Sequence, residues 1–446
     1  DSGDTFTIPS GATITNAGTA SGFGRTGTVD WVTTVKVTGD SPITGVTGKG
    51  YFLNTTAGTI TVNLPAGVAG SILAFKDYAG TWDTNNVTVT PNGSEKVGGI
   101  AGSATLSTER QSVTLIYIDS TQGWLDIHDS TSAVTGPLYV TATGGTPCAG
   151  ATSGDYKIHT FTGPGTLTVS CAGNAGGSNT VDYMVIAGGA GGGGEYGGGG
   201  GAGGYRESVP SPAAWTGSPI AFSGNARPVT ATPYTITVGG GGAGGSGGCV
   251  QGSDGNDSTF SDITSGKGGG GGSECCAGTI PSKRHGRDGG SGGGTSYYSP
   301  GPTAATVGAG NVPDVTPDQG FPGGLAITPG TAGHASGGGG GSGAVGVAAP
   351  SAPVAGAGGA GVISCISAPP TQRGGGGGGG GGGGPQPYTP GAGGAGGGGA
   401  GATDPGGAGT NGQDNTGGGG GGANNSGPSV GGTGGSGLVV LRYKFQ

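Results

Sequence analysis

The feature that most constrains this chain is its glycine, which is concentrated in long runs in the second part of the sequence. Of the 121 glycines, 29 lie in residues 1–187 and the other 92 in residues 188–446. Glycine offers no side chain to bury and loses the most entropy on folding, so such a segment cannot build an ordinary apolar core. A helical fold is disfavoured because each interior glycine costs about 1 kcal/mol relative to alanine. Collagen is excluded because no segment keeps a strict three-residue glycine period.

Before the glycine runs, the chain is a series of short β-branched segments separated by turn residues such as Asn92-Gly93 and Thr121-Gln-Gly123. This pattern predicts an all-β fold, with a sandwich or barrel-like module over residues 36–133 and an N-terminal attachment and β segment at 1–35. A smaller β segment is predicted at 134–187, with Gly163-Pro-Gly165 as a tight turn. The predicted strands are residues 31–38, 51–53, 59–64, 71–76, 86–90, 112–118, 123–127, 138–142, 156–162, 166–170 and 181–186.

Residues 188–446 form a separate glycine-rich distal domain in this interpretation. Apolar strand-like segments stand between the glycine runs, and the chain ends on one, residues 437–445. A flexible linker is the simplest interpretation of glycine-rich sequence. Against it, the runs are low in serine, alanine is their usual interruption, and a flexible tail has no need of a terminal apolar strand.

An ordered alternative is a lattice of polyglycine II helices framed by short β-strands. Such a helix has three residues per turn and no internal hydrogen bonds, so its N–H and C=O groups point outward. Without Cβ atoms, neighbouring helices approach closely enough to bond to one another. The longest run, residues 374–384, would span about 34 Å at about 3.1 Å per residue. We favour this ordered interpretation.

Six cysteines are present, and their pairing cannot be read from sequence. Cys148 and Cys171 flank the predicted hairpin at residues 163–165, which makes them the preferred disulfide candidates; buried free thiols are the alternative. No paired CxxC or Cys/His spacing occurs, so we expect no zinc site. The segment from Asp254 to Asp257 has calcium-like spacing, but it lacks the EF-hand glutamate and is interpreted as a polar turn before a strand.

Composition and motifs give no support to catalysis or to nucleic-acid binding. The formal charge is −8 and the few basic residues are not concentrated on one segment, so we expect no nucleic-acid partner. No run of 18 apolar residues exists, so no membrane insertion is expected. GxGxxG matches within the glycine runs lack a following helix. His159 has Asp155 nearby but no nucleophile elbow, and the carboxylates are scattered. We therefore expect a non-enzymatic protein without cofactors or metal ions.

Two stretches resemble known phage proteins. Asn54-Thr-Thr-Ala-Gly-Thr-Ile-Thr-Val-Asn-Leu-Pro65, with Phe75-Lys-Asp-Tyr-Ala-Gly80 and Gln122-Gly-Trp-Leu125, is similar to a module repeated in tail-fibre and other virion proteins of marine, cyanophage-type tailed phages. The opening segment from Gly3 to Ile14 resembles another segment of those proteins. Together they cover roughly residues 1–130, and they imply a structural module without indicating any chemistry.

The glycine-rich part resembles the receptor-binding adhesins of some T-even-like phages, in which glycine-rich stretches form a polyglycine sandwich with variable loops at the tip. Gly204-Tyr-Arg-Glu-Ser-Val-Pro-Ser-Pro212 and the terminal Gly-Leu-Val-Val-Leu-Arg-Tyr-Lys resemble recurrent pieces of glycine-rich marine phage tail proteins. The resemblance implies a location in the virion, contacts with other tail proteins and a host-surface partner, either a glycan or an outer-membrane protein. By analogy with fibres it also implies a homotrimer.

Sparse aromatic residues between the glycine runs are the candidates for receptor contact, because Tyr and Trp give large contact areas at low entropic cost. The alternative is that they pack on the glycine lattice or on a sister subunit. The sequence therefore predicts a tail-fibre or adhesin subunit that presents recognition loops; the alternatives are a structural fibre or capsid-decoration protein without a receptor role and a tail-associated glycan hydrolase. The candidate contacts are Trp215, Tyr297, Tyr298, Phe321 and Tyr388.

Overall fold

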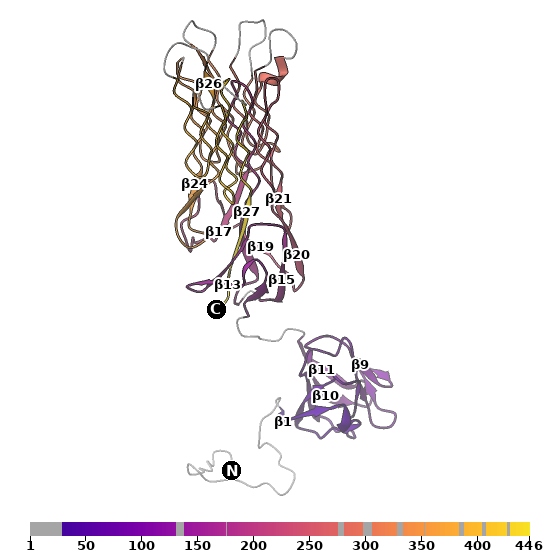
Figure 1. Cartoon of the computed structure of the whole chain (residues 1–446). Coiled ribbons are helices and arrows are strands. Elements are labelled where there is room, and N and C mark those ends of the chain that lie inside the picture. The colour runs from indigo at the N-terminus through magenta and orange to yellow at the C-terminus, as the bar shows by residue number, and fades with distance from the viewer. Residues whose placement is uncertain are drawn as a thin grey trace, which may run out of the picture. The chain divides into compact units, whose positions relative to one another are not determined.

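The chain has two compact units, residues 1–135 and residues 136–446, and each is described here by itself (Figure 1). The structure is a computed structural model, nearly all of it strand and extended chain. It describes residues 29–130, 138–174, 176–274, 281–297, 306–327, 333–351, 353–382, 388–403, 407–425 and 429–446.

The first unit is a β-sandwich of two sheets. Sheet order is β1-β3-β5-β10-β11-β7-β8 in the larger sheet and β2-β4-β6-β9 in the smaller one. The elements are β1 (Asp30–Val37), the short 3-10 helix η1 (Thr38–Asp40), β2 (Ile43–Thr44), β3 (Lys49–Asn54), β4 (Ile60–Asn63), β5 (Ile72–Asp77), β6 (Val87–Thr90), β7 (Lys96–Val97), β8 (Ile100–Ala101), β9 (Ala104–Leu106), β10 (Ser112–Asp119) and β11 (Gly123–Ser130).

Successive strands from β2 to β6 alternate between the two sheets of this unit. As a result β3 pairs with β5, and β4 with β6, in parallel. The Thr121-Gln-Gly123 turn, by contrast, joins an antiparallel hairpin between β10 and β11. Alternating side chains from both sheets fill one core, in which Trp82 and Trp124 are fully buried. The predicted sandwich is confirmed, and it includes β1, which begins at Asp30 in the predicted N-terminal attachment and β segment.

The second unit begins with a sandwich of its own. One sheet has the order β12-β15-β20-β21-β22, and the other β13-β14-β27-β16-β17-β18, with β19 beside β16. The strands are β12 (Val140–Thr143), β13 (Thr146–Ser153), β14 (Tyr156–Phe161), β15 (Gly165–Ala172), β16 (Thr180–Ile186), β17 (Tyr205–Val209), β18 (Phe222–Ser223), β19 (Arg227–Pro228), β20 (Pro233–Thr237), β21 (Ser258–Phe260), β22 (Ile263–Ser265) and β27 (Leu438–Lys444).

The last strand of the chain, β27, lies in the middle of its sheet. It pairs antiparallel with β14 on one side and with β16 on the other. Its side chains are buried on both faces, because odd positions such as Leu441 face the sandwich core and even positions such as Val440 face a second core. Residues 134–187 therefore do not form a separate segment, since their strands are completed by the C-terminus.

The Gly163-Pro-Gly165 turn does not close a hairpin. The strands on either side of it, β14 and β15, belong to different sheets, where β14 pairs with β13 and β27 and β15 pairs with β12 and β20. The local sequence marks the end of one strand and the start of the next, but the pairing partner is chosen by the core that the two sheets share.

Above the sandwich, the strands continue as glycine helices that bond to one another in a lattice. Along the run 197–204, every third N–H donates to the same neighbouring helix at 2.7–3.0 Å, and three neighbours are served in turn. The pairs are Gly197 with Ala423, Gly200 with Gly420 and Gly203 with Gly417; Gly198 with Gly272, Gly201 with Gly269 and Gly204 with Gly266; and Gly199 with Gly337 and Ala202 with Gly340. The residue numbers of the acceptors fall along the first two neighbouring helices and rise along the third. The first two neighbours are therefore antiparallel to the run 197–204, and the third is parallel to it.

This three-residue period is that of polyglycine II, and it confirms the ordered interpretation of the glycine runs. Glycine is required because the helices touch through their backbones. A Cβ atom on Gly199 would lie 2.0 Å from the carbonyl oxygen of Gly377, and one on Gly244 would lie 1.8 Å from that of Gly431. The short elements in this part are η2 (Pro281–Arg284), β23 (His334–Ala335), β24 (Val362–Ser364), β25 (Thr371–Arg373) and β26 (Gly381–Gly382).

Candidate functional site

Figure 1 labels β26 at the end of the lattice farthest from the sandwich of the second unit. This end carries a cluster of aromatic side chains. Tyr196 lies where the glycine helix 188–194 turns back into 197–204, and it adopts a positive φ of 47°. Its ring meets that of His334 edge-on at a centroid distance of 4.7 Å. The ring centroid of Tyr297 lies 3.7 Å from that of His334 and 5.9 Å from that of Tyr196. We call these three residues the end cluster.

Hydrogen bonds tie the end cluster to several lattice helices. The hydroxyl of Ser336 donates to the carbonyl oxygen of Tyr196 at 2.6 Å and accepts from the N–H of Tyr297 at 2.9 Å. The side-chain amide of Asn425 donates to the Tyr196 hydroxyl. Segments that are far apart in the sequence are thus held at one point.

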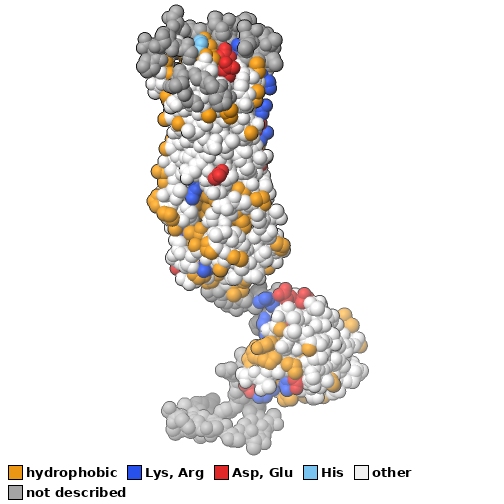
Figure 2. Space-filling model, viewed as in Figure 1, with side chains coloured by type: hydrophobic (Ala, Val, Ile, Leu, Met, Phe, Trp, Pro, Cys, Tyr) orange, Lys and Arg blue, Asp and Glu red, His pale blue; other side chains and the backbone are white. Residues whose placement is uncertain are grey.

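Two carboxylates lie beside the end cluster, at the end where acidic side chains gather in Figure 2. The N–H of Glu274 donates to the carbonyl oxygen of Glu195 at 3.0 Å. Burial raises the pKa of Glu274 to about 7, against the opposing effect of Arg284, and Glu195 adds a further upward contribution. Burial also raises the pKa of Tyr196 to about 12 and lowers that of His334. The end cluster is therefore uncharged at neutral pH, and the carboxyl group of Glu274 beside it titrates near neutral pH.

Between residues 274 and 429 the described chain has seven interruptions, and six of them, all except the one at residue 352, adjoin this cluster. Glu274, Tyr297 and Asn425 each precede one of them, and His334 lies just after another. Gly382, which precedes the fifth, pairs with His334 in the short β23–β26 ladder. Thr403, which precedes the sixth, accepts a 2.8 Å hydrogen bond from the side chain of Asn424. The connecting sequences at this end therefore start from one shared base.

The predicted contact residues are only partly brought together. Tyr297 belongs to the end cluster, but its side chain is buried. Tyr388 lies against Gly381, which pairs with Ala335, the residue after His334. Tyr298 lies outside the described residues. Sequence reasoning missed Tyr196, although Glu195-Tyr196 is the one break other than alanine in the run 188–204, and that break is the signal that marks the turn of the chain.

Trp215, another predicted contact residue, is buried within this chain. Its side chain is buried in the second core, with the guanidinium of Arg442 4.1 Å above its ring and Tyr156 edge-on at 5.4 Å. The Pro/Ser-rich context predicted an exposed loop, but this loop folds back over the outer face of the sheet. Phe321 lies on the side of the lattice, where it lines a groove of about 530 Å³ with Ile220 and Ile363.

The predicted disulfide is not formed, because Cys148 and Cys171 are both free thiols. Cys148 is in β13 and Cys171 is in β15, two strands that belong to different sheets. Cys365 is also free, whereas Cys249 is disulfide-bonded.

Two further candidates have structural roles. His159 is fully buried, with its ring nitrogens 2.7 Å from the carbonyl oxygen of Gly144 and 3.0 Å from the Tyr443 hydroxyl, so it is a core residue. Asp254 is paired with Lys267 at 3.1 Å and Arg287 at 3.4 Å. It lies in a glycine helix and not in the predicted turn. Within the described ranges, no three His, Cys, Asp or Glu side chains lie together as metal ligands would.

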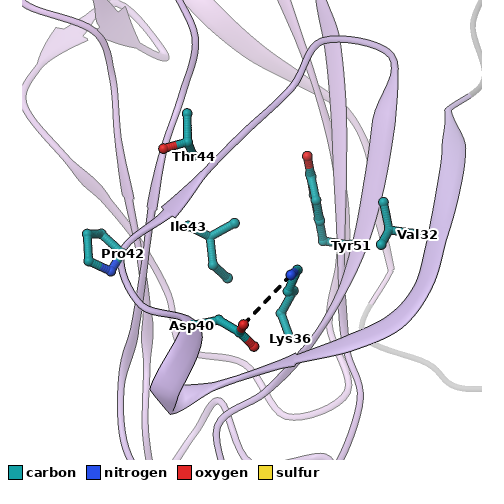
Figure 3. Close-up of a pocket in the computed structure, with 7 residues that line it drawn as sticks. All are labelled: Val32, Lys36, Asp40, Pro42, Ile43, Thr44 and Tyr51. Atoms are coloured by element: carbon teal, nitrogen blue, oxygen red, sulfur yellow. Dashed lines mark ion pairs between the residues drawn. The ribbon is translucent and has the colours of Figure 1, made fainter.

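The first unit has a cavity of about 390 Å³ between β1, β2 and β3 (Figure 3). Lys36 and Asp40 form an ion pair of 3.7 Å at this cavity. The Tyr51 hydroxyl accepts a hydrogen bond from the N–H of Val46 at 3.1 Å. Because these polar groups already have partners within the chain, we assign the cavity no ligand.

The hydrogen-bonded glycine helices on a β-sandwich define a polyglycine II protein. Residues 160–444 match the family model described as a glycine-rich domain, and the chain belongs to this family. A comparison with curated proteins finds no match. Among the residues that the structure describes, no helix has the length and apolar character needed to cross a membrane.

Proposed function

We propose that this chain is a tail-fibre or adhesin subunit of a tailed phage, which recognises the host surface at the end of its glycine lattice and catalyses no reaction. The observation that supports this most is the convergence of six connecting sequences on the end cluster. A hydrogen-bonded lattice holds their bases in place, which lowers the entropic cost of presenting them to a partner.

The partner would be a glycan or an outer-membrane protein of the host cell. The first unit would attach the chain to other tail proteins of the virion, in line with the resemblance of residues 1–130 to virion modules. Three copies are proposed by analogy with fibres.

A structural fibre or capsid-decoration role is the second candidate. It is favoured by the burial of Trp215 and Tyr297, since neither of these predicted contacts reaches the surface. The two candidates differ in whether the isolated chain binds cells.

The test is binding of the purified, labelled chain to a panel of cyanobacterial cells, together with competition against phage adsorption. We expect a variant with residues 299–304 replaced by a Gly/Ser sequence of equal length to lose binding. Its melting temperature should stay unchanged, because the end cluster is kept. The matched control replaces residues 211–214, which are exposed and belong to the loop over the sheet.

Full cell binding by the 299–304 variant would contradict the assignment of recognition to this end. A wild-type chain that is present in virions and binds none of the cells would favour the structural role. Release of sugar from cell-surface glycan by the purified chain would contradict the non-catalytic part of the proposal.

A further inference from the structure

In the outer helices of the lattice, the N–H group of every third residue points away from the neighbouring helices. Along residues 355–361, the N–H groups at 355, 356, 358, 359 and 361 donate to neighbouring helices. Among the described residues, the N–H groups of Ala357 and Ala360 have no acceptor, and both residues are partly exposed. On the neighbouring helix, residues 344–349, the N–H groups of Val345 and Ala348 likewise have no acceptor among the described residues. One side of the lattice therefore presents free donors at intervals of three residues.

This side is also apolar. We define the apolar wall as residues 321–327, 344–349 and 355–363, which are neighbours through bonds such as that from the Val347 N–H to the Ala357 carbonyl oxygen at 2.9 Å. Val345 and Ile363 are each 50% exposed. The groove beside Phe321 opens on this wall. Between Asp318 and Asp404, the sequence has one Lys, Arg, Asp or Glu, which is Arg373.

Another side of the same lattice is built differently. On the helix 250–257, the residues whose N–H groups have no backbone acceptor among the described residues are Gln251, Asp254 and Asp257, again at intervals of three. Asp254 is paired with Lys267 and Arg287 there. Figure 2 shows basic side chains along one edge of the lattice. Charged residues on an exposed edge prevent further chains from adding to it, as they do at the edges of β-sheets.

We propose that the apolar wall is an interface with a second copy of this chain. Free N–H groups at a three-residue interval are matched by the carbonyl groups of another polyglycine II helix, which has the same period. Depletion of charged residues is the mark of interface cores, and the sequence that contains this wall has one charged residue between Asp318 and Asp404. This inference rests on the self-association in the proposed function, and it names the surface involved.

The test is the mass of the full chain in solution, measured by sedimentation velocity over a series of concentrations. We expect the wild type to self-associate and the double variant Val345→Glu/Ile363→Glu to remain monomeric, with association weakened about 100-fold or more, because burying unpaired carboxylates in an interface is strongly unfavourable. Both side chains are half exposed in the single chain, so its melting temperature should be unchanged. If the double variant does not fold, Val345→Lys takes its place.

The matched control adds the same charge to another side of the lattice, as Ala408→Glu/Thr433→Glu, and should associate like the wild type. A monomeric wild type, an oligomer that persists in the Val345→Glu/Ile363→Glu variant, or dissociation of the control would each overturn the proposal. Cell binding, measured separately, tests the proposed function, since recognition at the lattice end does not require this wall to be covered.

Discussion

At the scale of single residues, the lattice depends on the absence of Cβ atoms at positions that look alike in sequence. Gly199 and Gly163 are both glycines with ordinary φ, yet a Cβ on Gly199 would lie 2.0 Å from the Gly377 carbonyl oxygen, whereas one on Gly163 would meet nothing within 4 Å. The tertiary neighbour, and not the local backbone, makes one of them indispensable.

The first prediction is that Gly199→Ala destabilises the second unit, whereas Gly163→Ala does not. The added methyl group would push the helix away from its neighbours and lengthen several hydrogen bonds, so we expect a loss of about 1–3 kcal/mol or more in the free energy of unfolding. Thermal unfolding of the two variants beside the wild type is the measurement. Equal melting temperatures for the two variants would contradict this prediction, because they would mean that the lattice accommodates the added methyl group without losing stability.

A second prediction concerns Asp182 in β16. Burial raises its pKa from 3.8 to about 6, although the Ser208 hydroxyl, which donates to it at 2.7 Å, and Arg442 both oppose the shift. A carboxyl group whose pKa is raised on folding adds most stability below pH 3.8, and this contribution is lost as the pH rises through about 6. The wild type should lose up to about 3 kcal/mol by this route between about pH 4 and pH 7.

In Asp182→Asn that loss should disappear, because the side chain no longer titrates. Urea denaturation at both pH values measures it, and Asp262→Asn, at an exposed carboxylate paired with Arg227, is the control that should follow the wild type. The assignment fails if Asp182→Asn keeps the full pH dependence.

At the scale of elements, the strands could be located from sequence, but their partners could not. Periods of β-branched and apolar residues predicted β1, β5, β10 and β16 to within a residue or two. Strands with little alternation were missed, among them β13, whose residues are mostly exposed, and β17, which follows directly on a glycine run. A turn sequence shows where a strand ends, but the core decides which sheet the next strand joins.

The third prediction follows from the central place of β27. Truncation after Gly437 removes the partner of both β14 and β16 and leaves Tyr183 and Met184 without the strand that covers them. We expect the second unit to lose its cooperative thermal transition. Truncation of the last residue alone, Gln446, is the control and should have no effect. A cooperative transition in the longer truncation would show that the lattice forms without its closing strand.

At the scale of the whole molecule, the fourth prediction is that the two units unfold independently. Their cores share no residues, and the contact pattern separates them at Thr135 and Gly136. A fragment of residues 1–135 should therefore fold alone and melt at the temperature of one of two transitions of the full chain, seen by calorimetry. A single shared transition, or an unfolded fragment, would contradict this.

The candidate site was the hardest part to derive from sequence. Aromatic residues among glycines suggested contact surfaces, but Trp215 lies in a core, Tyr297 packs on His334, and Phe321 lines a groove on the side of the lattice. In so glycine-rich a chain, the few large side chains are also the main source of apolar burial, so aromatic character alone does not indicate exposure. The break at Glu195-Tyr196 was the better signal, since it marks a place where the lattice turns.

The sequence by itself indicated the class of structure: the glycine runs exclude an ordinary apolar core and favour a backbone-bonded lattice, and β-branched segments supply the strands that frame it. Only the tertiary structure decided which strands pair, which cysteines stay free, and which sides of the lattice carry charge. The reason is that polyglycine is uniform along the chain. Each N–H and C=O is able to bond to any neighbouring helix, so register and neighbour are chosen by the β-sandwich that anchors the helices at one end and by the side chains that join them at the other.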